Sequence, residues 1–291
     1  MLSLLRAELY RSLRDKRLYL LIAVTFVLFW FFWGLEPIHS LGWLRRSIRS
    51  SGFPLIAASH GWADLSSDPE NIAAFFDYYI RFNISRRLFG GTIQPLLLSF
   101  YSAAILVGTR FTQRTIDIPV TRGVSRALVF LVSLIHFCLM NILILLLCLF
   151  GFLFLKFGTA WIPLFAPGFF LRCVGLWLWN ILAYLMLTFA AAWVMKNVFG
   201  TMLVSAGLFL LEAIAAIVMR LIDSTPAIGI HQIGLSLRTF LPLWFIALDD
   251  LWLPETVLTQ REGLLLFLIP MGYILCSVIV GWCCFRRREL N

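Results

Sequence analysis

Charged residues are scarce in this sequence. They make up 13% of its 291 residues, whereas hydrophobic residues make up 61%. A water-soluble domain has roughly 25% charged residues, which keep its surface hydrated. The composition therefore excludes a soluble globular protein and predicts an integral membrane protein.

Common catalytic and metal-binding motifs are also missing. The sequence has no nucleotide-binding P-loop, no H-E-x-x-H and no G-x-S-x-G. Its six cysteines lie in or at the ends of apolar runs without zinc or disulfide-framework spacing, and its four histidines are scattered. We therefore expect no catalytic residue, no metal site and no cofactor on this chain.

The net charge of +9 has a topological explanation. In a soluble protein it would suggest nucleic-acid binding, but here lysines and arginines lie mostly at the ends of apolar runs. Cytoplasmic loops of membrane proteins are enriched in these residues, which also bind anionic headgroups. We expect membrane lipids as partners, and no nucleic acid.

Six apolar runs are long enough to cross a hydrocarbon core of about 30 Å at about 1.5 Å per residue. The first lacks a small-residue cleavage site, so we expect a retained span rather than a signal peptide. The sequence predicts an all-α integral membrane protein, residues 1–291 forming one domain with six transmembrane helices. The predicted spans are residues 18–35, 90–108, 127–155, 169–194, 198–219 and 263–285.

Residues 1–17, before the first span, have the pattern of an amphipathic helix. Leucines recur at spacings of three and four, at Leu2, Leu5, Leu9 and Leu13, and basic residues surround them. This pattern is typical of a basic helix that lies in the headgroup plane. We expect an N-terminal helix on the membrane surface.

Two long polar regions are predicted on the extracytoplasmic side. Residues 36–89 form either an amphipathic helix resting on the outer interface or a small packed subdomain. Residues 222–262 are interpreted as a re-entrant or interfacial segment, because a crossing there would place Arg286, Arg287 and Arg288 outside. With six spans both termini share one side. That side holds thirteen of the 24 lysines and arginines, a small bias toward the cytoplasm.

Few polar residues lie within the predicted spans. Glu212 is the only carboxylate deep inside one, where a charge costs a few kcal/mol unless it is paired, hydrated or neutralised. It is either a substrate- or proton-contacting residue or a protonated group bonded to a neighbour. His136 and Asn180 are further polar groups within spans, and such groups commonly bond neighbouring helices. Together the three are a candidate intramembrane polar site.

The order of parts resembles a known family. Leu5-x-x-Glu8-Leu9-x-x-Ser12-x-Arg14 is similar to its N-terminal elbow helix, and Arg114-Thr115-Ile116 with Thr121-Arg122-Gly123-Val124-Ser125-Arg126 to its segment between the second and third spans. Phe285-Arg286-Arg287-Arg288-Glu289 is similar to its tail. The chain thereby resembles the permease subunit of type-2 exporter-class ABC transporters, especially small bacterial permeases of bacteriocin or lantibiotic immunity and multidrug export.

The resemblance implies a cytoplasmic coupling helix within residues 109–126, which docks in a groove of a separate ABC ATPase subunit. That subunit binds ATP and Mg, and the permease dimerises with itself or a related permease in the cell membrane, both termini being cytoplasmic. The complex exports an amphiphilic peptide, lipid or drug. The implied docking residues are Arg110, Arg114, Thr115, Asp117, Arg122, Gly123 and Arg126.

The side chains of residues 109–126 suit docking in two ways. The arginines can pair with carboxylates of a partner, and four apolar residues can fill a groove. These apolar residues are Phe111, Ile116, Ile118 and Val120. Topology alone also makes any cytoplasmic loop basic. Two other classes compete with the permease: an intramembrane or lipid-modifying enzyme that uses Glu212, and a non-transporting membrane sensor or immunity protein.

Overall fold

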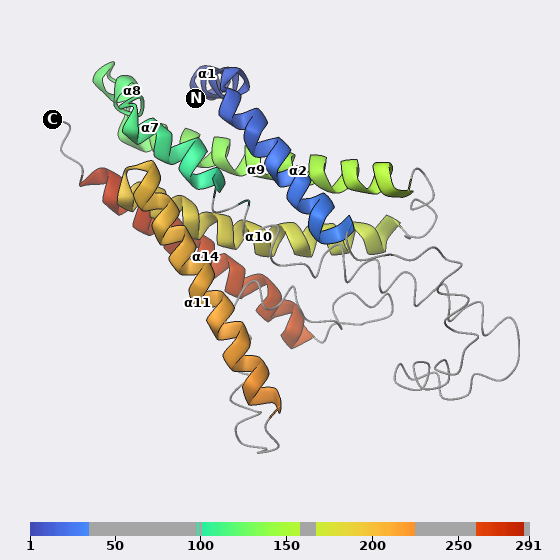
Figure 1. Ribbon diagram of the computed structural model, residues 1–291. Helices are drawn as coiled ribbons and strands as arrows, with labels where there is room; N and C mark the ends of the chain where they lie inside the picture. The colour runs from blue at the N-terminus through green and yellow to red at the C-terminus, as the bar shows by residue number, and fades with distance from the viewer. Residues whose placement is uncertain (35–97, 99–100, 158–166, 225–259, 288–291) are drawn as a thin grey trace, which may run out of the picture.

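The computed structural model describes residues 1–34, 98, 101–157, 167–224 and 260–287. Every regular element within these ranges is a helix, which confirms the all-α prediction for this part of the chain. The helices are α1 (Leu2–Arg14), α2 (Lys16–Gly34), the π-helix η1 (Ala104–Gly108), α7 (Thr109–Thr112), α8 (Asp117–Thr121), α9 (Arg126–Phe157), α10 (Pro167–Met195), α11 (Val198–Ser224) and α14 (Gln260–Arg286) (Figure 1).

Three helices are long and apolar enough to cross a membrane. The segments are Arg126–Leu155, Phe170–Met195 and Phe267–Arg286, which correspond to the third, fourth and last predicted spans. Among the described residues, Val198–Leu211 of α11 is a shorter apolar helix. A lipid core offers no water to the backbone, so an apolar run closes its hydrogen bonds within a helix. These helices indicate a membrane protein.

The other predicted spans are described in different degrees. Helix α2 covers the first and α11 covers the fifth. Of the second, residues 101–103 are α-helical and η1 follows directly. Residues 36–89 lie outside the described part, as does most of 222–262, so the two extracytoplasmic predictions concern residues that the structure does not describe.

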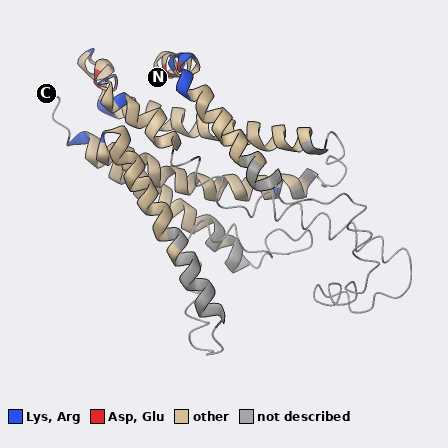
Figure 2. Ribbon diagram, in the orientation of Figure 1, with Lys and Arg blue, Asp and Glu red and all other residues tan. Residues whose placement is uncertain are grey.

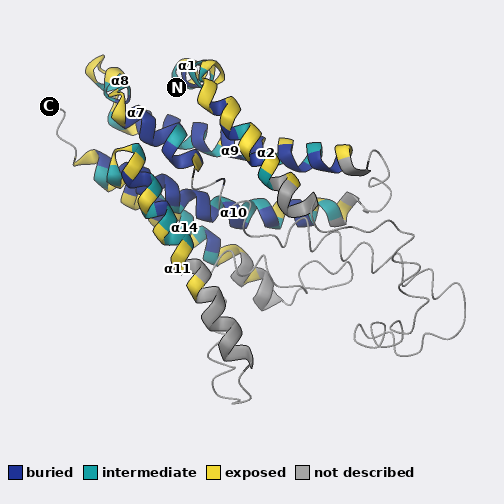
Figure 3. Cartoon of the chain, in the orientation of Figure 1, coloured by how far each residue is buried: buried dark blue, intermediate teal, exposed yellow. Residues whose placement is uncertain are grey.

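Helix α10 lies at the centre of the bundle. It packs most extensively against α14 and also against α11 and η1, and much of its surface is buried (Figure 3). Near its end the fully buried Trp193 meets rings from three other elements. The ring centroids lie 5.0 Å from Phe111 of α7, 5.0 Å from Phe130 of α9 and 4.6 Å from Phe285 of α14. We call these four residues the aromatic cluster.

Short polar turns separate two helix pairs. Between α1 and α2, the carboxylate of Asp15 accepts a hydrogen bond of 3.0 Å from the backbone N–H of Arg17 and caps the start of α2. Between α10 and α11, Lys196 has a φ of 55° and Asn197 accepts a bond from the N–H of Gly200. Lys196 and Asn197 thus form a tight polar turn between two apolar helices.

Basic residues gather at one end of the described bundle. Helices α1, α7 and α8 and the end of α14 all lie there (Figure 1), and Figure 2 shows most lysines and arginines of the described residues near this end. A bond of 3.0 Å from the Arg126 guanidinium to the backbone carbonyl of Arg286 joins the start of α9 to the end of α14. This end contains every described residue of the predicted docking segment.

Candidate functional site

Residues 109–126, which we call the basic segment, form two short helices that end in the same way. After α7, Arg114 takes a positive φ of 54° and its N–H bonds the carbonyl of Phe111, while the N–H of Thr115 bonds the carbonyl of Arg110. After α8, Gly123 has a φ of 86° and the same pair of bonds recurs one helix later. Both ends are Schellman motifs, in which a left-handed residue turns the chain away from the helix. Gly123 therefore has a structural role in this turn.

The predicted docking residues divide by exposure. Arg114, Arg122 and Gly123 are exposed, whereas Thr115, Asp117 and Arg126 are partly buried. Arg110 differs from all of them, because it is buried with only 5% of its surface exposed. It faces the interior of this chain, and a partner cannot reach it without moving α1.

Arg110 is held by partners on two other helices. Its Nη2 lies 2.6 Å from Oε1 of Glu8 in α1, and its Nη1 donates a bond of 2.8 Å to the hydroxyl of Ser133 in α9. Burial lowers the pKa of the Arg110 guanidinium below its ordinary value, which the Glu8 carboxylate opposes and the nearby Arg11 reinforces. An arginine stays protonated at neutral pH. The pair is therefore a buried ion pair.

Two further residues of α1 bond the same region. Arg11 donates to the hydroxyl of Thr115 at 2.8 Å and to the side-chain carbonyl of Gln113 at 3.3 Å. The Ser12 hydroxyl lies 2.9 Å from Nε2 of His136 in α9. Spacings of three and four place residues 8, 11 and 12 on one face of the helix. We call Glu8, Arg11, Ser12, Arg110, Ser133 and His136 the polar cluster.

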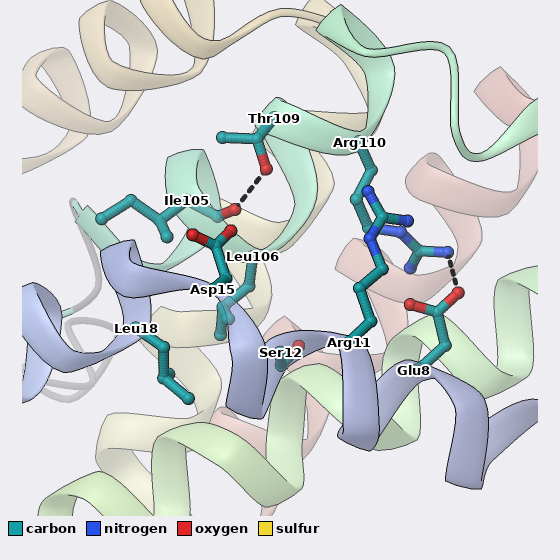
Figure 4. A pocket seen from close by; sticks show the side chains of 9 residues that line it. All are labelled: Glu8, Arg11, Ser12, Asp15, Leu18, Ile105, Leu106, Thr109 and Arg110. Atoms are coloured by element: carbon teal, nitrogen blue, oxygen red, sulfur yellow. Dashed lines mark hydrogen bonds and ion pairs between the residues drawn. The ribbon is translucent and has the colours of Figure 1, made fainter.

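A small cavity adjoins the polar cluster. It has a volume of about 30 Å³, which is room for about one water molecule. It lies between α1, η1 and α7, and Figure 4 shows Glu8, Arg11 and Arg110 on one side and Asp15 and Thr109 on the other. A space of this size does not admit a peptide, lipid or drug.

The polar cluster changes the interpretation of α1. The leucine spacing predicted a helix in the headgroup plane; in this bundle Leu2 and Leu13 are 80% and 54% exposed, and Glu8 is the one residue of α1 that is buried. Leu4 and Leu9 pack partly against the core. The face that holds α1 to the bundle therefore includes polar side chains. Two sequence signals pointed to Glu8: it is the sole acidic residue before Asp15, and it belongs to the motif that resembles an elbow helix.

The apolar residues of the basic segment lie mostly inside. Phe111 and Ile116 are buried, and Val120 packs partly against the core. Only Ile118 of the four predicted groove-filling residues is exposed, with 45% of its surface free. The hydrophobicity of this segment therefore serves mainly its own packing.

The structure describes two of the three side chains of the predicted intramembrane site. His136 is buried and contacts Ser12 in the polar cluster. Asn180 is buried in α10 and donates a bond of 2.8 Å to the carbonyl of Leu176, one turn earlier. Glu212 lies in α11, and its side chain is outside the described part of the structure. His136 thus belongs to the polar cluster, and the shared polar site stays a prediction.

Comparison with known proteins adds no name to this arrangement. No protein-family model matches the chain, and no curated protein matches it. The fold and the site define the class on their own: a helical membrane protein whose basic segment is fixed to its N-terminal helix at one end of the bundle. A narrower class of protein depends on the residues at this basic end of the bundle.

Proposed function

We propose that this chain is the membrane-spanning permease subunit of an ATP-driven exporter of the ABC class. It would cross the cell membrane six times with both termini in the cytoplasm and move an amphiphilic peptide, lipid or drug outward. A separate ATPase subunit would bind ATP and Mg, and a second copy or a related permease would complete the pathway. One observation carries the proposal: the exposed part of the basic segment lies at the same end as the basic residues of α1 and α14 (Figure 2).

The exposed residues of this end suit a protein partner with an acidic groove. Arg114 and Arg122 are exposed, and Ile118 lies between them in sequence with nearly half of its surface free. Charged side chains of this kind steer association and fix its register, while an apolar side chain supplies an anchor. The docking surface we propose is therefore Arg114, Ile118 and Arg122, a narrower set than the sequence predicted.

The buried part of the basic segment supports a role in transmitting motion. A partner that presses on α8 acts on a segment whose other side contacts α9 through Ser133 and α10 through Phe111. Closing of the ATPase subunits would then displace the ends of the spans and alternate the access of the substrate pathway. The permease itself would hydrolyse nothing.

Copurification from the native membrane tests the proposal. The tagged chain should retain a P-loop ATPase subunit, identified by mass spectrometry, and the purified complex should hydrolyse ATP. The double variant Arg114→Glu with Arg122→Glu should lose most of the bound subunit, because it places negative charge against the partner's carboxylates.

A matched control carries the same change in charge elsewhere. Lys16→Glu with Arg17→Glu alters two exposed residues at the start of α2 and should keep the ATPase subunit. Appreciable ATP hydrolysis by the isolated chain, or an intact complex in the double variant of the basic segment, would contradict the proposal.

A further inference from the structure

The basic segment and α1 are far apart in sequence but joined in the structure. We infer that the Glu8–Arg110 ion pair is a positioning device, which makes α1 and the basic segment one unit that moves together. Glu8 and Arg110 would contact neither a partner nor a substrate. The inference rests on the proposed function only for the cause of the movement. That α1 and the basic segment move together is argued from the contacts between them.

The basic segment needs positioning because its helices are very short. Helix α7 has four residues that extend η1, and α8 has five residues between two turns. A helix of five residues is far too short to be stable by itself. Beyond the backbone link to η1, the orientation of the segment depends on side chains that reach other elements. In α7 these are Arg110, which bonds α1 and α9, and Phe111, which packs on Trp193 of α10.

Helix α1 has no direct chain connection to the basic segment. Helix α7 is continuous with η1 before it, and short turns connect α8 to α7 and to α9, so a displaced segment pulls η1 and α9 through the backbone. It acts on α1 only through side chains. Among the described contacts, the Glu8–Arg110 pair is the buried link, and the bonds from Arg11 to Thr115 and Gln113 are its more exposed neighbours.

The chemistry of the pair gives a signature that packing alone would not. Neutralising one partner leaves the other as an uncompensated buried charge, whereas neutralising both removes the charges together. The two single changes should therefore be more disruptive than the double change. A pair that merely filled space would show effects that add.

Hydrogen–deuterium exchange of the full chain in lipid nanodiscs tests the inference without any partner. Glu8→Gln and Arg110→Gln should each speed amide exchange in both α1 and residues 113–123, by about tenfold or more. The double variant should speed exchange less than either single one. Arg6→Gln, on the exposed side of α1, is the matched control and should leave both regions unchanged.

A milder variant keeps the test possible if the uncompensated buried charge prevents Glu8→Gln or Arg110→Gln from folding. Ser133→Ala removes one hydrogen bond of Arg110 but keeps the ion pair, and it should speed exchange modestly in both regions. Faster exchange in α1 alone, or additive effects of Glu8→Gln and Arg110→Gln, would overturn the inference. If exchange behaves as expected but no ATPase subunit copurifies, the positioning role stands and the proposed function fails.

Discussion

Arg110 and Phe111 are neighbours in α7, yet they are held in opposite ways. Arg110 points to Glu8 and Ser133, where contacts of 2.6 Å and 2.8 Å hold its two terminal guanidinium nitrogens. Phe111 points to Trp193, which is surrounded by rings from several helices. One short helix thus belongs to the polar cluster on one side and to the aromatic cluster on the other.

The two clusters differ in how strongly they depend on a single partner. Each aromatic contact is weak and loosely directional, and Trp193 has several of them, so the energy is spread over many residues. The ion pair concentrates its energy in one geometry, and its charges are costly when separated. The aromatic cluster therefore stabilises the packing of several helices through many contacts. The polar cluster instead fixes the position of α1 against α7 and α9 through one geometry.

The largest expected effect is on the aromatic cluster. Trp193→Ala removes a fully buried ring that contacts three other helices, and we expect a loss of about 3–5 kcal/mol in the free energy of unfolding. Unfolding in mixed micelles, followed by tryptophan fluorescence and circular dichroism, measures this loss. The neighbouring Val194→Ala, on an exposed position, should cost about 0.5 kcal/mol or less. Equal losses for the two variants would mean that the rings do not hold this end together.

The next largest expected effect on the free energy of unfolding concerns the ion pair of the polar cluster. Arg110→Met leaves Glu8 buried without its cation, and we expect a loss of about 3 kcal/mol. Adding Glu8→Leu should restore part of that stability, because no unpaired charge remains. Combining Trp193→Ala with Phe111→Ala should instead lower stability further than either change. The same micelle unfolding measures both double variants, and a Glu8→Leu change that deepens the loss would show that the pair is not charge-coupled.

Much of the bundle was predictable from the sequence. The predicted spans 127–155 and 169–194 lie within three residues of the ends of α9 and α10, because long apolar runs and the polar turn after Met195 set these ends locally. The six-span topology needs residues 36–97 and 225–259 as well, all of which lie outside the described part. The sequence therefore predicts the ends of these helices, whereas the number of membrane spans also depends on residues outside the described part.

The polar cluster was not predictable in the same way. Glu8 and Arg110 are 102 positions apart, and neither belongs to a periodic pattern that would connect them. Arg110 was predicted to dock because it lies in the segment that the resemblance makes a coupling helix and because an arginine can pair with a partner's carboxylate. Only the packing of α1 decides that Arg110 faces inward while Arg114 and Arg122 are exposed.

The smallest expected effect concerns the close backbone approach of η1 to the start of α11. A Cβ on Gly108, just before α7, would lie 3.2 Å from Cα of Val198 and 3.3 Å from the carbonyl oxygen of Asn197, whereas a Cβ on Gly207 of α11 meets nothing within 4 Å. Backbone atoms yield less readily than the tip of a side chain, so Gly108→Ala should cost about 1 kcal/mol by forcing η1 and α11 apart. Gly207→Ala should gain about 0.5 kcal/mol, since alanine loses less backbone entropy in a helix. If both variants changed the free energy of unfolding in the same direction, the close approach of η1 to α11 would not constrain the basic segment. The position of that segment would then depend on the polar and aromatic clusters alone.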